Sequence, residues 1–155
     1  MKMENIINPP PPLSHRFEVR FSDLGIVPNT VDMRFQKVSG INAEISTDTI
    51  PDGGQNLYSH RVPTKISYNN LVLERGMMQG SPLRAEFNAA LAFFRFTPSN
   101  VIVILYSEES VPLAGWLFMK AYPVKWSIAD LDAGANAVVI ETMELAYTRF
   151  QILYI

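Results

Sequence analysis

The run "VIVILYS" restricts the fold more than any other feature, because its apolar residues leave no polar face. It spans Val101–Ser107, and after the turn "EES" a second apolar run follows, "PLAGWLFMKAY". A strand that is apolar on both faces is expected to lie centrally in a sheet and to be covered on both sides. The two runs therefore predict a pair of neighbouring buried strands in a β-rich fold.

Further strands are predicted by alternation of apolar and polar residues. In "HRFEVRF", Phe17, Val19 and Phe21 alternate with charged residues, which is typical of a half-buried strand. The remaining extended segments are Met33–Ile50, in which Gly40 marks a bend or bulge, then Thr64–Gly76, and one long final strand over Ala137–Ile155. A loop is predicted over Pro51–Pro63, where glycines and prolines gather.

One helix is predicted over Pro82–Phe94. Ser81 is a suitable N-cap and Pro82 a suitable first helical residue. Its predicted apolar stripe consists of Leu83, Phe87, Ala90, Leu91 and Phe94. The aromatic residues expected in the core are Trp116, Trp126, Phe93, Phe94 and Phe96. The fold class is thus mainly β, a barrel- or sandwich-like domain of about seven or more strands with one flanking α-helix.

At 155 residues, the chain is expected to form a single domain over 15–155, preceded by a proline-containing arm over 1–14. The arm carries Pro9–Pro12, which favour a stiff extended path. Two interpretations of the arm stay open: a tether before the first strand, or an arm that docks on a neighbour.

Composition narrows the classes of partner. Charged residues make up 18% of the chain, below the roughly 25% of ordinary domains, which suits either a Ser/Thr-rich monomer or a subunit hidden against partners. The net charge is −2 with scattered basic residues, so no nucleic-acid footprint is present. The sequence has no cysteine, no signal-peptide core and no run of about 18 apolar residues, so we expect cytoplasmic assembly without stable membrane insertion.

Four carboxylates near the C-terminus raise the question of catalysis or metal binding. Glu141 and Glu144 lie three apart on a predicted strand and so point to opposite faces. Asp130 and Asp132 lie in a connection, where aspartates commonly accept hydrogen bonds from nearby backbone N–H groups. A Ca²⁺ loop would need more oxygen ligands than this stretch offers.

Other signs of an enzyme are equally weak. His15 and His60 have no metal-ligand spacing, no G-x-S-x-G elbow occurs, and "PDGGQN" lacks the Lys-Ser/Thr of a phosphate-binding loop. We therefore predict no catalytic, cofactor-binding or metal-binding residues, and no cofactor.

Four stretches, in order along about residues 17–150, resemble the inner tube proteins of contractile phage tails and related injection systems. The stretch "AYPVKWSIADLDAGANAVVIETMELAYTRF" is similar to the C-terminal hallmark of that family. The others are "MRFQKVSGINAEI", "SHRVPTKISYNNLVLERGM" and "NVIVILYSEESVPLAGWLF". The residues of this chain that match the hallmark are Trp126, Asp130, Asp132, Asn136, Glu141 and Glu144.

This resemblance implies a structural subunit whose hexameric rings stack into a hollow tube inside a contractile sheath. Extended hairpins then serve ring assembly. The implied partners are further copies of the chain, a tube paralogue, sheath subunits, spike or hub and baseplate proteins, and cargo protein or DNA in the lumen. The particle would be a phage tail or an injection particle.

The resemblance implies assembly contacts for two segments of the chain. The extended segment Ile41–Ile50 is polar on one side, which is expected to line the lumen or the ring interface, while its other side is expected to pack on the domain. Its candidate residues are Ile41, Ala43, Ile45, Ser46, Thr47 and Thr49. The loop after it is expected to contact the next ring, through Asp52, Gly53, Gly54, Gln55, Asn56 and Tyr58.

Three stretches resemble the baseplate-proximal paralogue, which initiates the tube, more than the bulk tube protein. They are "HRVP", "LVLERGM" and "PVKWSIADLDA". Two alternatives stay open at this point. One is the related ring protein of type VI secretion, which is expelled and carries effectors. The other is a monomeric β-barrel that binds a small ligand.

Overall fold

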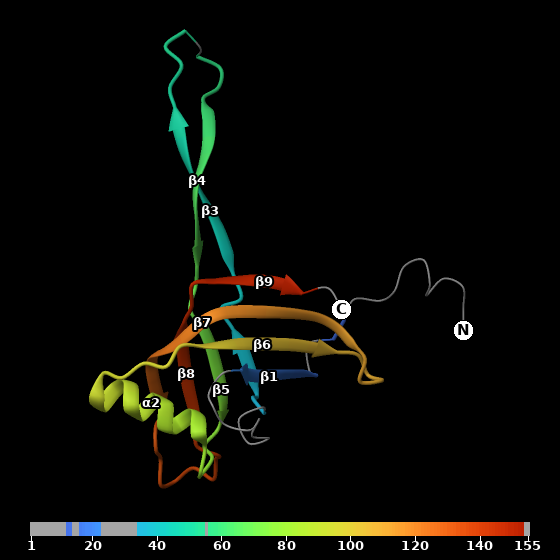
Figure 1. The fold of residues 1–155 in the computed structure, drawn as a ribbon, viewed down its shortest axis with the longest axis vertical. Coiled ribbons are helices and arrows are strands. Elements are labelled where there is room, and N and C mark those ends of the chain that lie inside the picture. Colours follow the sequence, from blue (N-terminus) through green and yellow to red (C-terminus); the bar gives the residue numbers. More distant parts are fainter. Residues whose placement is uncertain (1–11, 14–15, 23–33, 55, 154–155) are drawn as a thin grey trace.

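A computed structural model describes residues 12–13, 16–22, 34–54 and 56–153, and in these ranges it contains nine strands and one helix (Figure 1). Nearly all of the predicted arm, 1–14, lies outside the described residues, as does Gln55. The elements are β1 (Phe17–Ser22), β2 (Lys37–Ser39), β3 (Ala43–Ile50), β4 (His60–Tyr68), β5 (Leu71–Gly76), α2 (Pro82–Phe93), β6 (Ser99–Tyr106), β7 (Pro112–Ile128), β8 (Ile140–Ala146) and β9 (Arg149–Leu153).

Strand β7 organises the body of the subunit because its two halves pair with different strands. The first half pairs with β6 and β9, and the second half pairs with β8. Lys120 lies between them with a φ of 53°, a conformation that turns the strand sharply. The resulting sheet has the order β1-β6-β7-β8-β5-β2, with β9 beside β7.

The bent sheet wraps a core to which both of its halves contribute. Val101, Val103 and Phe118 are buried from the first half, and Leu73 and Met143 from the second. The prediction that β6 and β7 are neighbouring strands inside the sheet is confirmed. The prediction that β6 is covered on both faces is wrong for the subunit alone.

The uncovered face of β6 is apolar. Ile102 and Ile104 alternate with the buried valines and stay half-buried, as does Leu117 opposite Ile102. An apolar run therefore indicated burial correctly, but on this face the described part of the subunit does not provide it.

Helix α2 closes one side of the core, as predicted. The Ser81 hydroxyl accepts a hydrogen bond from the Arg84 N–H at 3.2 Å and so caps the helix. Leu83, Phe87 and Ala90 are buried. No helix in the described ranges is long and apolar enough to cross a membrane.

The prediction is wrong for the C-terminal residues of the apolar stripe, which are exposed and not buried. Leu91 is 57% exposed, and Phe94 is 82% exposed and forms the C-cap after the last helical residue, Phe93. Phe93 and Phe96 are also exposed rather than core residues. Trp116 and Trp126 do pack against the core, as expected.

Three predicted boundaries also change. The long final strand breaks after Ala146 into β8 and β9, because these two strands pair with opposite halves of the bent β7. The segment over Thr64–Gly76 belongs to two strands, β4 and β5, which meet at Asn69 and Asn70. The predicted loop Pro51–Pro63 is shorter, because β4 already begins at His60.

Candidate assembly surfaces

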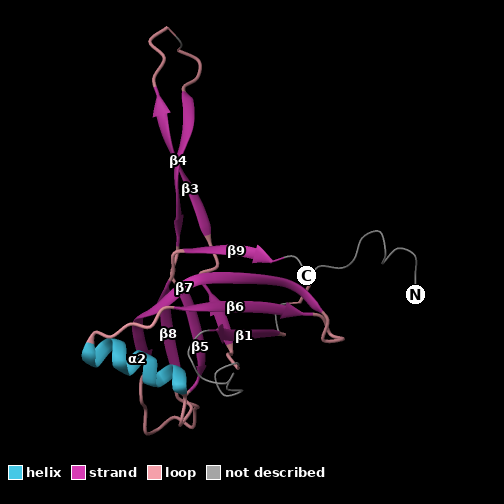
Figure 2. Cartoon of the chain, in the orientation of Figure 1, coloured by secondary structure: helices cyan, strands magenta, loops and turns pink. Residues whose placement is uncertain are grey.

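The β3–β4 hairpin projects from the body as a two-stranded arm (Figure 2). Seven of the eight residues of β3 are exposed, and eight of the nine of β4. We expected one face of this segment to pack on the domain; the structure corrects this, because no described residue covers either face of the outer hairpin. An isolated two-stranded hairpin is marginal in water, so a partner is needed to stabilise it.

The two faces of the hairpin differ in polarity. Cross-strand partners share a face, so the pairing assigns each residue. One face is mainly apolar and carries Ala43, Ile45, Thr47, Thr49, Arg61, Pro63, Ile66 and Tyr68. The other is mainly polar and carries Glu44, Ser46, Asp48, Ile50, His60, Val62, Lys65 and Ser67.

The candidate lumen or ring-interface residues are therefore divided. Ala43, Ile45, Thr47 and Thr49 share the apolar face, whereas Ser46 lies on the polar face. Ile41 precedes β3 and packs against the core. The sequence pattern located the segment but grouped residues of both faces, because Ser46 and Thr47 are adjacent in the strand and point to opposite sides.

Replacing Ser46 or Thr47 by Asp is expected to leave the subunit folded, with a change in unfolding free energy within about 0.5 kcal/mol. Neither side chain contributes to the core cluster, and Arg61 already donates a 3.0 Å hydrogen bond to Thr47. Denaturant titration followed by circular dichroism measures the effect. The same substitution at Leu73, which is 0% exposed, is the control and should unfold the subunit. Unfolding by Ser46→Asp would show that this face is core.

The hairpin tip combines polar candidates with two exposed apolar side chains. Asp52, Gly53 and Gly54 are exposed, and Asn56 follows them in the described chain. Tyr58 is 58% exposed and packs edge-on against His60 with ring centroids 5.4 Å apart. Leu57 is 91% exposed, and sequence analysis missed it. Its position between Asn56 and Tyr58 in a polar loop is the feature of the sequence that could have identified it as an exposed contact residue.

The two aspartates of the β7–β8 connection behave as turn residues. Asp132 accepts a hydrogen bond from the Gly134 N–H at 2.9 Å through its carboxylate, which confirms the turn interpretation for that residue. Asp130 and Asn136 are exposed in the same connection. Among the described residues, no group of three or more metal-binding side chains is close enough to hold an ion.

The two glutamates of β8 face opposite sides, as predicted, but their environments differ. Glu144 accepts a 2.8 Å hydrogen bond from Asn70 near the surface. Glu141 is 0% exposed and pairs with Arg75 at 2.7 Å. The glutamate that looked like a candidate for surface chemistry is therefore half of a buried ion pair.

The buried ion pair joins four elements. Arg75 on β5 also donates to the Ser81 hydroxyl at 2.7 Å, next to α2, and its guanidinium lies 5.2 Å from the Phe35 ring centre. Glu141 accepts a second hydrogen bond, 3.3 Å, from the Trp126 indole on β7. These contacts fix β5, β8, β7 and the start of α2 relative to one another, so this part of the family motif is structural.

Sequence analysis missed Arg75, although a signal existed. Arg75 follows Leu71 and Leu73 at period two, and Glu141 precedes Met143 and Leu145 at the same period. When two strands are neighbours, as β5 and β8 are, residues of opposite charge that continue their buried apolar faces indicate a buried ion pair.

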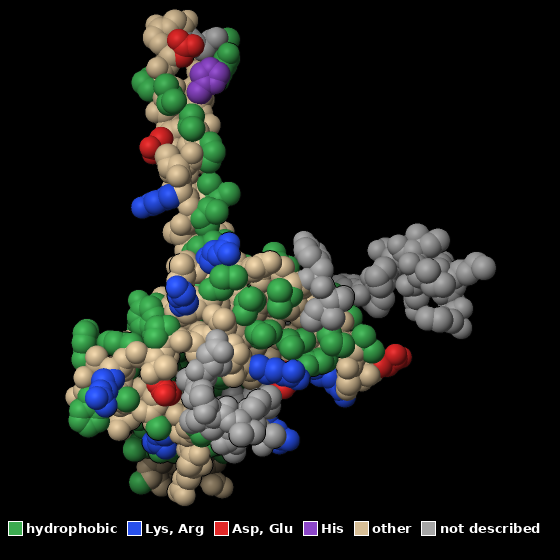
Figure 3. Space-filling view, in the orientation of Figure 1, with side chains coloured by type: hydrophobic (Ala, Val, Ile, Leu, Met, Phe, Trp, Pro, Cys, Tyr) green, Lys and Arg blue, Asp and Glu red, His purple; other side chains and the backbone are tan. Residues whose placement is uncertain are grey.

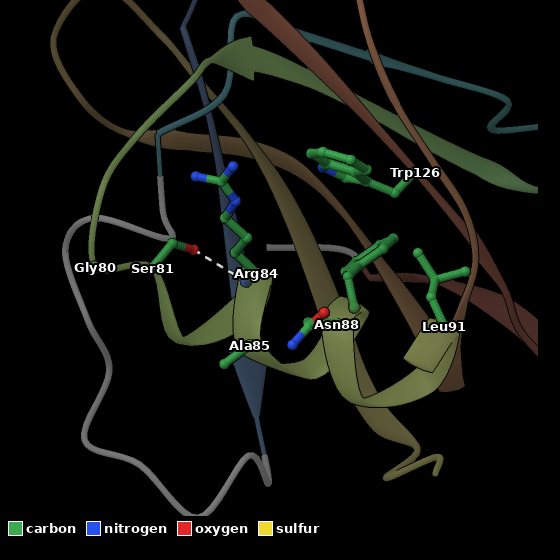
Figure 4. Close-up of a pocket in the computed structure, with 8 residues that line it drawn as sticks. Gly80, Ser81, Arg84, Ala85, Asn88, Leu91 and Trp126 are labelled. Atoms are coloured by element: carbon green, nitrogen blue, oxygen red, sulfur yellow. Dashed lines mark hydrogen bonds between the residues drawn. The ribbon is translucent and has the colours of Figure 1, made fainter. Parts of the chain in front are cut away.

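A hollow of about 450 Å³ lies between α2 and Trp126 (Figure 4). The Arg84 guanidinium lies 5.7 Å from the Trp126 ring centre, so the one charged side chain of its lining is already stacked on an aromatic ring. The other lining residues include Ser81, Asn88 and Leu91. This lining contains no pair of acid and base groups, so the hollow is better suited to a partner's side chain than to a reaction.

An aromatic cluster lies at the C-terminal end of α2, and we define it as Phe94, Phe96 and Tyr122. The Phe94 and Phe96 rings meet edge to face at 4.9 Å, and the Phe96 and Tyr122 rings at 5.7 Å. Phe93 is beside it in sequence and is 71% exposed. Hydrophobic side chains gather at this end of α2 in the space-filling view (Figure 3). Such a contiguous exposed patch marks an interaction surface.

A charged group lies on the outer face of the first half of the sheet. Glu18 forms an ion pair with Arg20 at 2.9 Å, and the Tyr106 hydroxyl donates to Glu18 at 2.8 Å. The hydrogen bond from Arg20 lowers the pKa of Glu18, and that from Tyr106 adds to the effect. Burial raises the pKa of Tyr106, so its hydroxyl stays a donor. The group is thus internally neutralised at the edge of the sheet.

Comparison with known proteins agrees with these features. The family model described as T4-like virus tail tube protein gp19 matches residues 13–151. A chain in the sixfold-symmetrised baseplate of the anti-feeding prophage has 35% identity and a TM-score of 0.86, covering 94% of this chain and 97% of that one. No curated protein matches at a significant level.

More distant structures share the fold. A chain of the extended sheath–tube complex of an extracellular contractile injection system has 18% identity and a TM-score of 0.81, covering 100% of this chain and 99% of that one. Hcp1 from Salmonella typhimurium has 15% identity and a TM-score of 0.54, with coverage of 89% and 85%. These likenesses confirm a mainly β fold with one helix.

Proposed function

Because the chain belongs to the T4-like virus tail tube protein gp19 family and is a structural subunit of a phage tail or contractile injection particle, we propose that it forms the ring nearest the baseplate, where the tube begins. Its ring would be sixfold, like the symmetry of the baseplate that contains its 35% identical relative. Its role is mechanical: to start the tube and to transmit its geometry to the next layer.

The observation that carries the position in the tube is the difference in identity between relatives. Identity is 35% to the chain in the anti-feeding prophage baseplate, against 18% for the chain of the sheath–tube complex and 21% for the chain of the tube-terminating cap. All three share most of the fold, so overall shape does not separate them, whereas sequence identity does. The proposal therefore includes hub or spike proteins below the ring and a tube paralogue above it.

The hairpin supports the tube role. Its polar face, with Glu44, Asp48 and Lys65, suits a water-filled lumen, and its apolar face, with Ile45 and Ile66, suits burial against a neighbouring subunit. Joining open strands around a ring also removes exposed sheet edges. The tip, with Leu57 and Tyr58, would then reach the adjacent ring.

The alternatives have less support. The likeness to Hcp proteins is at 12–15% identity and concerns the fold alone. A monomeric ligand-binding barrel does not account for the family match, nor for the uncovered hairpin. Neighbouring genes for a sheath and spike, without a secretion membrane complex, would separate an injection particle from type VI secretion.

Replacing Leu57 by Asp is expected to abolish stacking while rings still form, because the change removes the most exposed apolar side chain of the tip, the candidate contact with the next ring. Negative-stain electron microscopy of the purified protein measures this: the unchanged protein should give rings and short tubes, and the variant single rings. Asn56→Asp is the control, since it adds the same charge without removing an apolar group. A purified protein that stays monomeric at high concentration would contradict the proposed function itself.

A further inference from the structure

We propose that the aromatic cluster is the lateral contact of the ring and packs onto the outer face of β6 and β7 of the next copy of this chain. The inference rests on the proposed function, because it names the two surfaces that close the ring.

The aromatic cluster is held in a fixed, outward arrangement. Phe94 adopts a left-handed backbone conformation, with φ 52° and ψ 38°, which residues other than glycine, asparagine and aspartate rarely adopt. Phe96 and Tyr122 brace it edge to face. Preformed, rigid aromatic side chains are typical anchors of protein interfaces because they bury a large area with little loss of conformational entropy.

A matching apolar face exists at the other end of the same strands. Ile102, Ile104 and Leu117 alternate with core residues and point to the outer face, where they are half-buried. Val111 and Leu113 continue this surface and are 52% and 43% exposed. Hydrophobic side chains gather over this part of the sheet in Figure 3. Both surfaces are therefore apolar at their centres.

The borders of the two surfaces carry opposite charges. Arg95 follows Phe94 in the chain, and Lys120 precedes Tyr122 by two residues; both are exposed. The turn after β6 carries Glu108 and Glu109, also exposed. On the same face, Glu18 is neutralised by Arg20, and Arg16 donates to the backbone carbonyl of Glu108 while keeping its own positive charge. Two carboxylates against one guanidinium leave this border with a net negative charge.

The positions of the surfaces suit a closed ring. The C-terminal end of α2 and the turn between β6 and β7 lie at opposite ends of strand β6 (Figure 1). A contact between two different surfaces on opposite sides of a subunit is heterologous, and such contacts generate rings when the rotation closes. An isologous pairing of the cluster with itself would stop at a dimer and bring Arg95 and Lys120 together with their own copies.

Phe94→Asn is the test variant, because Asn tolerates the left-handed conformation and removes only the aromatic side chain. We expect a folded subunit by circular dichroism, and a ring-forming concentration raised at least about tenfold in sedimentation velocity, as for loss of an interface anchor. Leu131→Asn is the matched control: Leu131 is 77% exposed in the β7–β8 connection, away from both surfaces. Its ring-forming concentration should stay unchanged.

Cysteine cross-linking tests the pairing directly, since the chain has no cysteine. In the double variant Arg95→Cys with Glu109→Cys, oxidation should give a ladder of covalent multimers up to the full ring, whereas each single variant should give none. Rings that form without a ladder and persist in Phe94→Asn would overturn the inference and leave the proposed function intact. Rings that persist but no longer bind sheath would assign the cluster to the sheath and also overturn it. Absence of rings in the unchanged protein would instead overturn the proposed function.

Discussion

Replacing Glu141 by Gln is expected to lower the free energy of unfolding by about 3 kcal/mol or more, the usual loss when one partner of a buried ion pair is removed. Glu141 is 0% exposed and Arg75 is 2% exposed, so water cannot take over the role of the missing carboxylate. A single domain is stable by about 5–15 kcal/mol, so this substitution removes a large part of the total.

The loss is expected because Arg75 keeps its charge when its partner becomes neutral. The guanidinium would still donate to the Ser81 hydroxyl at 2.7 Å and lie over the Phe35 ring. The indole of Trp126 would also lose its carboxylate acceptor, so the junction of β5, β7, β8 and α2 loosens at once.

Urea unfolding followed by circular dichroism, at one protein concentration, measures this prediction. Glu144→Gln is the matched control on the same strand: its hydrogen bond to Asn70 is near the surface, and we expect a change of about 1 kcal/mol or less. A double variant, Arg75→Met with Glu141→Met, should recover most of the loss, because it removes the charges of both members of the pair. Equal effects of Glu141→Gln and Glu144→Gln would show that the buried pair contributes no stability.

The fold class could be predicted because strand and helix periods are local properties. Leu83 and Phe87 on α2 follow helical spacing and are buried, and the apolar run Val101–Ser107 predicts the central strand β6, of which Val101 and Val103 are buried. The bend in β7 could not be predicted, because it depends on Lys120, whose left-handed φ has no signature in its residue type. The division of the final strand into β8 and β9 follows from that bend and was missed with it.

Assembly surfaces were predicted less well for a physical reason. Apolar periodicity indicates that a residue will be buried, but it does not say by which chain. Phe94 and Phe96 were therefore placed in the core of the subunit, although they are exposed there. The hairpin shows the reverse case: the mild polarity of Ser46 and Thr47 locates the segment, but these neighbours lie on opposite faces, and the pairing with β4 makes one face mainly apolar.

Replacing Gly40 by Ala is expected to destabilise the subunit by about 2–5 kcal/mol, the sum of a left-handed backbone in an L-residue and an overpacked contact. Gly40 has a φ of 85°, and a Cβ there would lie 2.0 Å from the backbone carbonyl oxygen of Asn70. Backbone atoms cannot rotate away as a flexible side chain can, so the chain itself must move.

The position of Gly40 gives this substitution a second consequence. Gly40 lies between β2 and β3, where the hairpin leaves the body, and Asn70 begins the return into β5. Displacing Asn70 shifts the base of the hairpin and hence its direction. We therefore expect Gly40→Ala to reduce tube length in electron micrographs even in conditions where the subunit remains folded.

Substitutions at two further glycines separate the effect of the left-handed backbone from the effect of the close contact. Gly80 has a φ of 73° but no atom within 4 Å of an added Cβ, so Gly80→Ala should show only the conformational loss of about 1–2 kcal/mol. Gly53, in the hairpin tip, has open space and no left-handed φ, so Gly53→Ala should be nearly neutral. The order Gly40, Gly80, Gly53 in thermal and urea unfolding is thus the predicted result. If Gly40→Ala costs no more than Gly80→Ala, the close approach of Asn70 does not hold the hairpin base in place.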